Sequence, residues 1–541
     1  MEIKRAVTNV RAVVLFAIFI VLFSILLGRV LFIQVSKEVN GQELEALAEQ
    51  NWGKTKPIKG KRGTIYDRNG GALAQEVNSY TVFAVLNKDF ESYVKDPAET
   101  AKALAPLINT DESELEKWLS SPDRFQVELG SGSRNLSYAQ MKEIEALELP
   151  GIYFHVEPKR YYPKHTYASH VIGYMDRNEG KAVMGLERSL AEQLKPKDGV
   201  IEYRADRKGF PLPNPNQHIT PANDGNHIYL TLDSNIQTAL EQVMTKVDEQ
   251  YEPERMVAIV ADPKTGQILA MSNRPSFNPN EYEQITNYMN FAISDHFEPG
   301  STMKMFTVAA AMEEGLYNGG EYFQSGQLTI GPDTVSDHNQ GLGWGEITYD
   351  EGFLRSSNVA VSKIALEKLG SEKYYEYLEK FGFGQPTGID LPNEANSLIA
   401  RGAQYDTAAS AFGQGTAVTP IQQIQAATAI ANGGKMMRPY VIDRIVDANT
   451  NEIIEQHEPE AAGEPISEQT ADNMLDLMEK VISSSEGTGR PYYLEGFQVA
   501  GKTGTAQIRN PEGGGYLTGH GNNIFSFIGM APKMIRASSF M

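Results

Sequence analysis

The longest apolar segment of the chain lies near its N-terminus. Residues 12–33 are hydrophobic or small throughout, apart from Ser24 and Arg29. A helix of about 20 apolar residues crosses the hydrocarbon core of a bilayer, and an arginine near its end can extend its charge to the interface. The pattern therefore predicts a transmembrane helix over residues 12–33.

Basic residues indicate the orientation of this helix. Three of them precede it within residues 1–11, and basic residues favour the cytoplasmic side of a membrane span. We expect residues 1–11 to be a cytoplasmic tail and the chain beyond residue 33 to lie outside the cytoplasm. A cleaved secretion signal is the alternative, but the bulky side chains of residues 31–33 make a poor cleavage site and favour an uncleaved anchor.

Beyond the anchor the pattern alternates between strand-like and helix-like stretches. Residues 34–53 are polar and compatible with a helical stalk. The following elements are then predicted in order: a β-rich stretch from Lys54 to Val85 with a turn at Asn69-Gly70, a helical stretch from Pro97 to Pro150, and a β-containing stretch that includes Arg160–Pro163 and Val171–Tyr174. No catalytic set of side chains appears in this half, so we expect a spacer or an interaction module.

Residues 210–226 are rich in proline and asparagine and predict a linker, with a domain boundary after residue 225. Further elements are predicted in order: strand Ile228–Leu232, helix Ser234–Asp248, hairpin Met256–Met271, a core helix from Ser301 to Gly315, a short helix opening at Thr348, a helix from Thr419 to Gly433, and strand Phe497–Ile508. Strands that frame helices in this way indicate an α+β domain with helices on both faces of an antiparallel sheet.

Composition excludes several classes of function. The chain has 541 residues, enough for two or three folded units, and no cysteine, which excludes disulfides, thiolate metal sites and a cysteine nucleophile. Its 9 histidines are scattered without the spacing of metal ligands, so we expect no metal and no other cofactor. The net charge of −20 argues against nucleic acid as a partner, because phosphates require a basic face.

Three short strings carry the candidate chemistry and occur in one order: Ser301-Thr302-Met303-Lys304, Ser356-Ser357-Asn358 and Lys502-Thr503-Gly504-Thr505. Together they supply a hydroxyl nucleophile, a cation that can activate it, a second hydroxyl with an amide, and a basic strand edge. An acyl-serine enzyme needs these groups.

Local context supports the first string. Ser301 follows Pro299-Gly300 and opens a run that is apolar to Met312 apart from Lys304 and Thr307. This predicts a core helix that carries Ser301 and Lys304 on one face of its first turn. Burial lowers the pKa of a lysine, which can then accept the serine proton, and the N–H groups of a helix start favour an oxyanion.

Other segments match the strings by composition alone: Ser92-Tyr93-Val94-Lys95, Ser133-Arg134-Asn135, Ser276-Phe277-Asn278 and Lys264-Thr265-Gly266. We expect Ser92 on a polar surface and Lys264 in the turn of a hairpin, whereas Lys502 lies inside a predicted strand, where glycine often marks close approach of a ligand or backbone. Residues 496–503 also fit the phosphate-binding P-loop pattern. A helix would have to begin at the lysine, and the residues that follow favour a strand, so we expect no nucleotide site.

With these strings placed, the chain resembles the class B penicillin-binding proteins, membrane-anchored D,D-transpeptidases that cross-link peptidoglycan. The likeness also includes motifs of the first half and the domain junction: Arg62-Gly63, Asp67-Arg68, Gly185-Leu186-Glu187 and Leu232-Asp233. It implies an elongated β-rich pedestal or dimerisation domain over residues 34–225 and a β-lactamase-like transpeptidase domain over residues 226–541. The chain looks most similar to the septal, penicillin-binding protein 2B-like type of Gram-positive bacteria, and a sporulation-specific relative is the alternative.

The resemblance implies a role for each string. Ser301 would attack the penultimate D-Ala carbonyl of a stem peptide ending in D-Ala-D-Ala, Lys304 would be the base, and Ser356 would relay protons. Asn358 would hold the substrate amide and orient Lys304. Lys502 would supply positive potential for the substrate.

The third string would also bind the substrate directly. Thr503 and Thr505, with Gly504 between them, would bind the substrate carboxylate, and the backbone N–H groups of Ser301 and Thr505 would form the oxyanion hole. β-Lactams would acylate Ser301 as well. Division proteins and a lipid-linked glycan polymerase are the partners that the resemblance implies.

The C-terminal end departs from the family pattern. After a strand expected at Asn523–Met530, members of the family continue with another core strand and a helix, whereas this sequence stops at Met541. We expect a shortened product that lacks this strand and helix and binds penicillin poorly or not at all, although all three strings are present. The alternative functions are a catalytically impaired scaffold of the division machinery and a D,D-carboxypeptidase. A class A β-lactamase would need a Glu-x-x-Leu-Asn string, which the sequence lacks, and a β-lactam sensor would need several membrane spans.

Overall fold

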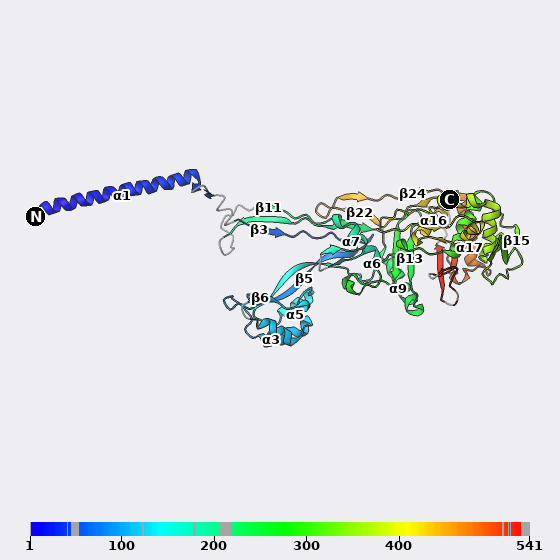
Figure 1. Cartoon of the computed structure of the whole chain (residues 1–541), viewed down its shortest axis with the longest axis horizontal. Helices are drawn as coiled ribbons and strands as arrows, with labels where there is room; N and C mark the ends of the chain where they lie inside the picture. Colours follow the sequence, from blue (N-terminus) through cyan, green and yellow to red (C-terminus); the bar gives the residue numbers. More distant parts are fainter. Residues whose placement is uncertain are drawn as a thin grey trace, which may run out of the picture. The chain divides into compact units, whose positions relative to one another are not determined.

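The computed structural model describes residues 2–39, 42–44, 53–121, 124–176, 180–205, 218–510, 513–517, 519 and 521–531 of the chain. The chain divides into two compact units, whose elements are labelled in Figure 1. One unit comprises Met1–Lys61 and Pro196–Asp224, and the other comprises Arg62–Lys195 and Gly225–Met541. The second unit draws residues from both sides of position 225, and the domain boundary expected there stays a prediction.

The first unit begins with helix α1 (Glu2–Ser36). Its part Val10–Ser36 is long and apolar enough to cross a membrane, by length and composition. The helical stalk expected over residues 34–53 is helical only to Ser36, the last residue of α1. It is wrong beyond that point, where two short strands, β1 (Glu38–Val39) and β2 (Gln42–Glu43), pair antiparallel. Lys37 has a φ of 55°, in the left-handed region, and this conformation ends α1 before the strands. Residues 45–52 of the expected stalk lie outside the described part of the chain.

The rest of the first unit is a three-stranded antiparallel sheet. Strand β10 (Gly199–Arg204) lies between β3 (Gly53–Ile58) and β11 (His218–Thr220). The linker expected over residues 210–226 therefore contains a strand, because pairing with β10 satisfies backbone groups that a free linker would leave to water. Residues 210–217 of this linker lie outside the described part.

A seven-stranded sheet, in the order β23-β22-β12-β4-β5-β6 with β7 also paired to β5, runs through the second unit. Its strands are β4 (Ile65–Tyr66), β5 (Ala72–Val85), β6 (Gln126–Glu128), β7 (Ile152–Tyr161), β12 (His227–Leu230), β22 (Ile442–Val446) and β23 (Ile453–Gln456). All neighbours are antiparallel except β12 and β4, which are parallel. The expected β-rich stretch and the strand at Ile228 are confirmed.

Short helices accompany this sheet: α3 (Pro97–Ile108), α4 (Glu112–Leu119), α5 (Tyr138–Glu145), α6 (Ser169–Ile172) and α7 (Gly185–Ser189). The first three confirm the helical stretch, and they share an apolar core with β5 and β7. The β assignment of Val171–Tyr174 is wrong at its first two residues, which belong to α6. Both are buried in an apolar cluster, and burial outweighs the strand preference of β-branched side chains.

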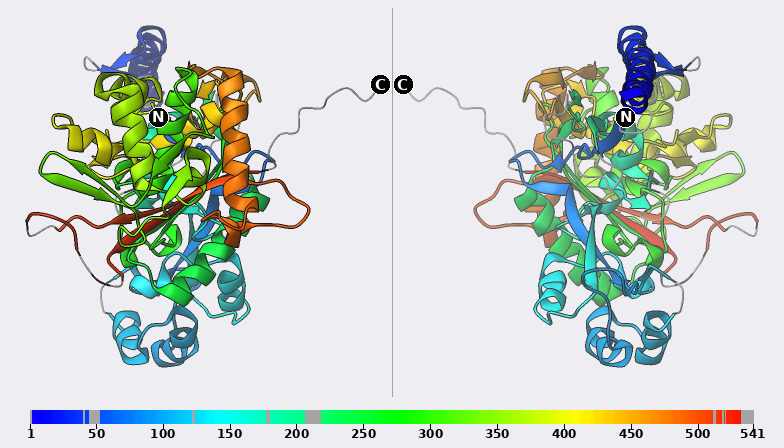
Figure 2. Two further views of the ribbon diagram at one scale, coloured as in Figure 1. Left: turned by 90° about the vertical axis from the view of Figure 1, so that its right-hand side faces the viewer. Right: turned by 90° about the vertical axis from the view of Figure 1, so that its left-hand side faces the viewer.

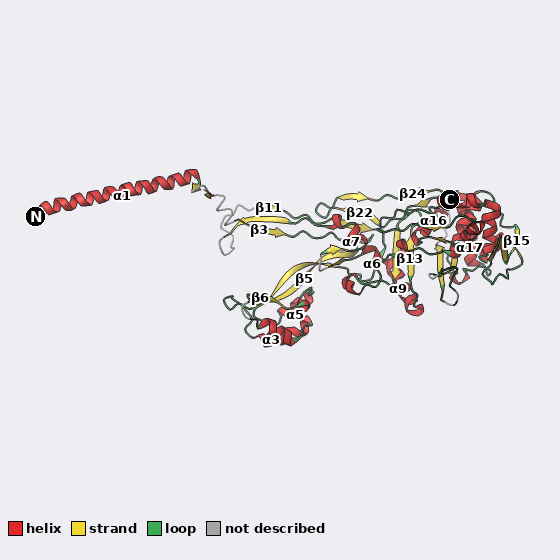
Figure 3. Ribbon diagram, in the orientation of Figure 1, coloured by secondary structure: helices red, strands yellow, loops and turns green. Residues whose placement is uncertain are grey.

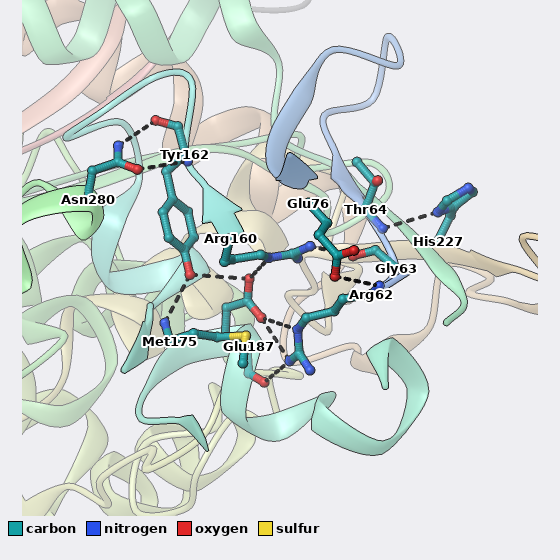
Figure 4. A network of polar contacts seen from close by, with 10 residues as sticks. All are labelled: Arg62, Gly63, Thr64, Glu76, Arg160, Tyr162, Met175, Glu187, His227 and Asn280. Carbon is teal, nitrogen blue, oxygen red and sulfur yellow. Dashed lines mark hydrogen bonds and ion pairs between the residues drawn. The ribbon is translucent and has the colours of Figure 1, made fainter. Parts of the chain in front are cut away.

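One buried carboxylate, that of Glu187, joins its own motif to the Arg62-Gly63 motif (Figure 4). Glu187 is fully buried, and its two oxygens form ion pairs with Arg62 at 2.9 Å and Arg160 at 2.6 Å. The Tyr162 hydroxyl lies 3.4 Å from the same carboxylate, and the Tyr162 backbone exchanges two hydrogen bonds with the Asn280 side chain. Burial, with the Glu187 charge, raises the pKa of Tyr162 well above its ordinary value, so the hydroxyl stays protonated.

Helices and two hairpins build the part of the second unit that carries the three strings (Figure 3). The helices are α9 (Ser234–Tyr251), α10 (Phe291–Ser294), α11 (Lys304–Glu313), α12 (Tyr349–Leu354), α13 (Asn358–Lys363), α14 (Ser371–Lys380), α15 (Gln404–Ala411), α16 (Pro420–Ala431) and α17 (Glu468–Ser483). The hairpins pair β13 (Met256–Ala261) with β14 (Ile268–Arg274), and β25 (Ala500–Gln507) with β26 (Asn523–Met530).

Helix α11 lies in the largest apolar core, together with residues of α13, α14, α16 and α17. Helix α17 packs against β25, and the two can be followed as the orange helix and the red hairpin in Figure 2. In the described part of the chain the two hairpins share no strand pairing, so the expected antiparallel sheet is present as two separate pairs. The strand expected at Asn523–Met530 is confirmed. Residues 532–541 lie outside the described part, and the expected loss of a further strand and helix stays a prediction.

Candidate active site

Ser301 lies at the start of the buried helix expected from the sequence. Its turn is a 3-10 helix, η3 (Gly300–Met303), which continues directly into α11. Gly300 has a φ of 57°, a conformation that favours glycine, and it allows the sharp entry after Pro299. All side chains from Met303 to Ala311 are buried, whereas Ser301 itself, at the N-terminal end of this core helix, is half-buried.

The strand that carries the third string lies against this turn. A Cβ atom on Gly504 would lie 2.1 Å from Ser526 Oγ and 2.8 Å from Pro299 O, and one on Gly300 would lie 2.6 Å from Thr505 O. Only glycine at both positions permits so close a contact between β25 and η3. The close backbone approach expected at Gly504 is confirmed.

The amine of Lys304 points toward the second string. Lys304 is fully buried, and its Nζ donates to Ser356 O over 2.5 Å and to Asn358 Oδ1 over 2.7 Å. Asn358 Nδ2 donates to Ser336 O over 2.9 Å, which fixes its Oδ1 toward the amine. Both N–H groups of a neutral amine are engaged by these two acceptors, so its lone pair remains available for a hydroxyl proton.

Ser356 brings two of its oxygens to the lysines through an unusual backbone conformation. Its φ is 61°, in the left-handed region that costs energy for a residue with a Cβ. Lys502 is also fully buried, and its Nζ donates to Ser356 Oγ over 2.8 Å and to Thr503 O over 3.1 Å. Lys304 Nζ lies 3.3 Å from the same hydroxyl oxygen, so Ser356 Oγ bridges the two amines.

Burial lowers the pKa of both lysine amines. It is the main cause that lowers the pKa of Lys304 well below its ordinary value, and the positive charge of Lys502 lowers it further, while the negative charge of Asp337 raises it. Burial also lowers the pKa of Lys502 to about 7. At neutral pH the pair can therefore supply a neutral amine as a base beside a second amine that can hold a proton.

Asp337 supports the Ser356 turn, and the sequence analysis missed it. It is 2% exposed and directly follows strand β17 (Asp333–Ser336). Its Oδ1 accepts hydrogen bonds from Ser357 Oγ over 2.7 Å and from Val359 N over 3.1 Å, and its Oδ2 accepts one from Gly326 N over 2.8 Å. The only sequence signal is an acidic residue at the end of a short alternating stretch, a pattern too common to single it out.

The remaining predicted site residues lie along β25. Thr503 Oγ1 forms a hydrogen bond of 2.9 Å with Thr488 Oγ1, and Thr505 is exposed. The structure thus gathers Lys304, Ser356, Asn358 and Lys502 through direct hydrogen bonds, and it places β25 against the turn of Ser301.

The chance matches lie where their context predicts. Ser92 is in a loop, where its hydroxyl accepts from Gly151 N over 2.9 Å, and Lys95 is exposed. Lys264 lies in the turn between β13 and β14. The P-loop-like stretch leads into β25 rather than into a helix. Within the described ranges, no three His, Asp or Glu side chains are arranged to hold a metal ion.

Two family models match the chain. Residues 256–538 match the penicillin binding protein transpeptidase domain, and residues 57–230 match the penicillin-binding protein dimerisation domain. Stage V sporulation protein D of Bacillus subtilis is 35% identical over 525 residues, which cover 94% of this chain and 79% of that protein. The probable peptidoglycan D,D-transpeptidase PenA of Neisseria gonorrhoeae is 29% identical, with 98% of this chain and 87% of that protein covered. The crystal structure of penicillin binding protein 2X from Streptococcus thermophilus is similar at a TM-score of 0.73 and 29% identity, over 89% of this chain and 75% of that one.

Proposed function

The chain belongs to the class B penicillin-binding proteins, and from this membership we propose that it cross-links peptidoglycan as a serine D,D-transpeptidase. One observation carries the proposal: Lys304 and Lys502 converge on the hydroxyl of Ser356, next to the strand that lies against the turn of Ser301. An acyl-serine enzyme requires this combination of nucleophile, base and proton relay.

The first half-reaction acylates Ser301. Its Oγ attacks the carbonyl carbon of the penultimate D-Ala, and its proton passes to the neutral amine of Lys304, whose pKa is lowered by burial. The bond to the nitrogen of the terminal D-Ala then breaks, and this nitrogen takes a proton through Ser356 Oγ, which accepts a hydrogen bond from Lys502. The terminal D-Ala leaves as a free amino acid.

The second half-reaction transfers the acyl group. An amine of a neighbouring stem peptide attacks the ester carbonyl and gives one proton through Ser356 Oγ to Lys502, which replaces the proton donated in the first step. The new amide bond forms as the ester bond to Ser301 breaks, and Ser301 recovers its proton from Lys304. Negative charge develops on the carbonyl oxygen in both steps. The backbone N–H groups of Ser301 and Thr505 are the donors we assign to it, because η3 and β25 are in contact there, and such preorganised donors contribute several kcal/mol to catalysis.

The substrate carboxylate is assigned to the third string. Thr503 and Thr505 offer hydroxyl groups on β25, and the protonated amine of Lys502 contributes positive potential. β-Lactams, which carry a similar carboxylate beside a reactive carbonyl, acylate the same serine.

We propose that this chemistry takes place at the membrane, and the apolar helix Val10–Ser36 supports this assignment. We assign residues 1–11 to the cytoplasm, residues 12–33 to the anchor, residues 34–225 to the pedestal or dimerisation domain and residues 226–541 to the transpeptidase domain outside the cytoplasm. Division proteins and a lipid-linked glycan polymerase are the proposed partners.

Mass spectrometry of the full-length protein treated with benzylpenicillin tests the proposal. Although the sequence alone suggests poor penicillin binding, the contacts of Lys304 and Lys502 with Ser356 lead us to expect one adduct, on the peptide that contains Ser301, and its loss in Ser301→Ala. Ser92→Ala is the matched control, because Ser92 and Lys95 have the same spacing in a surface loop, and it should keep the adduct. An adduct elsewhere, or none, would refute the proposal. Product analysis with an added amine acceptor separates transfer from hydrolysis by a D,D-carboxypeptidase.

Two cell-wall processes are candidates for this activity: septum formation and sporulation. A septal role stays a prediction, whereas the 35% identity with stage V sporulation protein D favours a role in sporulation. Expression of this chain in Bacillus subtilis strains lacking that protein distinguishes the two: restored sporulation would support the second role.

A further inference from the structure

We infer that Asp337 is a positioning residue for acylation: its carboxylate holds the Ser356 turn against Lys304 and serves as the counter-charge of the buried Lys304 amine. This inference rests on the proposed acyl-serine function. Asp337 lies outside the three strings. Its hydrogen bonds reach neither the nucleophile nor either lysine.

The hydrogen bonds of Asp337 fix the geometry of the turn. Ser357 Oγ and Val359 N, which flank Asn358, both bind Oδ1, over 2.7 and 3.1 Å. The backbone of Asp337 is itself held to Gly326, whose O accepts from Asp337 N over 2.9 Å. The residue thus ties the second string to the β16–β17 hairpin (Gln327–Ile330 and Asp333–Ser336), and it does so next to a backbone conformation that requires support.

The donors to Asp337 are all uncharged. In the described part of the chain no lysine or arginine forms an ion pair with it, although it is 2% exposed. A buried carboxylate that has no oppositely charged group in direct contact must be compensated by a positive charge nearby. The charge of Asp337 acts on Lys304, which is fully buried and whose amine binds Ser356 and Asn358 of the string that Asp337 holds.

Among the groups that act on Lys304 in the described part of the chain, Asp337 is the negatively charged one. Lys304 comes from α11 and Lys502 from β25, while Ser356 and Asn358 are neutral and the Phe353 ring faces Lys502 at 5.8 Å. The guanidinium of the adjacent cation, Arg355, is paired with Glu351 at 2.8 Å and with Glu486. With Lys304 protonated, the charge of Asp337 offsets a buried positive charge, and loss of the carboxylate would leave that charge uncompensated.

Loss of the Asp337 charge should make the lysine pair release its proton more readily. The carboxylate favours the protonated form of Lys304 and so raises its pKa against the larger effect of burial. Without the carboxylate, Lys304 becomes neutral, and therefore active as a base, at a lower pH. The acid limb of the acylation rate should move to lower pH, by an amount of the order of one unit for an opposite charge at this range.

Asp337→Asn in the full-length protein tests this directly. The amide keeps an oxygen for Ser357 and Val359 but carries no charge. We expect a lower maximal rate of acylation by a fluorescent penicillin and an acid limb displaced to lower pH. Ser357→Ala is the matched control: it removes a donor to Asp337 and the N-cap of α13 but leaves the charge, so its rate should fall at every pH with the limb in place.

A second readout does not depend on acylation. In protein labelled with ¹⁵N-lysine, the Nζ resonance of Lys304, assigned with Lys304→Met, should titrate at lower pH in Asp337→Asn than in the parent. Asp337→Ser gives the same comparison should the amide variant fail to fold. An unchanged Lys304 titration, or an equal displacement in Ser357→Ala, would overturn the inference. Absence of any penicillin adduct in the parent protein would instead overturn the proposed function, and the lysine titration would still decide the role of Asp337.

Discussion

Lys502 donates a hydrogen bond of 2.8 Å to the hydroxyl of Ser356, although the two residues are 146 positions apart in the sequence. The Nζ atom of Lys304, in the first string, lies 3.3 Å from the same hydroxyl oxygen. One hydroxyl therefore joins two buried amines, and a proton can pass between them without entering water. We therefore expect both the acylation rate and the stability of the fold to depend on the protonation of Lys304 and Lys502.

The acylation rate should show a bell-shaped dependence on pH. It rises as Lys304 loses its proton, and it falls as pH rises above about 7, because Lys502 then loses the positive charge that attracts the substrate carboxylate. Stopped-flow measurement with a fluorescent penicillin gives both limbs. Lys502→Arg keeps the charge at high pH, so its alkaline limb should disappear even if its maximal rate is lower. A wild-type rate that stays constant through pH 7 would contradict this role.

Burial of Lys502 should cost stability at neutral pH. Its pKa is about 7 in the folded protein and about 10.4 in an unfolded chain. Between these values the unfolded chain binds more protons, so stability rises with pH, and below about 7 the full cost applies.

Lys502→Met should therefore raise the Tm at neutral pH while it abolishes acylation. The gain in Tm should become smaller as the pH is raised toward the ordinary lysine pKa, where the wild-type amine is neutral in both the folded and the unfolded state. Thermal denaturation at several pH values measures this. Lys264→Met, at an exposed lysine in the β13–β14 turn, should leave the Tm unchanged, and an equal gain in that control would remove the link to burial.

Local pattern was sufficient for those parts of the site that are built from one segment. The apolar run after Ser301 predicted the core helix, because a helix buried on all faces has no polar side to show. The strand-like stretch around Lys502 predicted a strand, and context excluded the same string at Lys264. These expectations depend only on residues close in sequence.

Contacts between distant segments could not be derived in this way. Asp337 acts through Ser357 and Val359, about 20 residues further along the chain, and no local motif marks such a pair. The parallel pairing of β12 with β4 also joins residues far apart, and α6 forms where a strand was expected because tertiary burial outweighs propensity. The 3-10 turn at Ser301 depends on its contact with β25, which the helix pattern alone does not contain.

Gly504→Ala should impair acylation by separating the third string from the nucleophile. The new Cβ would lie 2.1 Å from Ser526 Oγ and 2.8 Å from Pro299 O, so β25 would have to move away from η3. Since misplacement of catalytic groups by about 1 Å can cost about 100-fold in rate, we expect a loss of roughly that size in the acylation rate. Gly320→Ala is the control, because its Cβ would meet nothing closer than 3.7 Å. A Gly504→Ala protein as fast as the control would show that the contact does not position the site.

Glu187→Gln should destabilise the fold far more than a matched change at the surface. The amide keeps the shape of the side chain but removes the only carboxylate paired with both Arg62 and Arg160 in the described part of the chain. Breaking a buried ion pair from one side typically costs about 3–5 kcal/mol, because the remaining charges stay buried without compensation. We therefore expect a clearly lower Tm in thermal denaturation. Glu145→Gln removes a carboxylate from an exposed pair with Lys142 and should leave the Tm unchanged. Equal Tm values for the two variants would mean that Glu187 does not stabilise this part of the fold, and that the motifs converge on it for another reason.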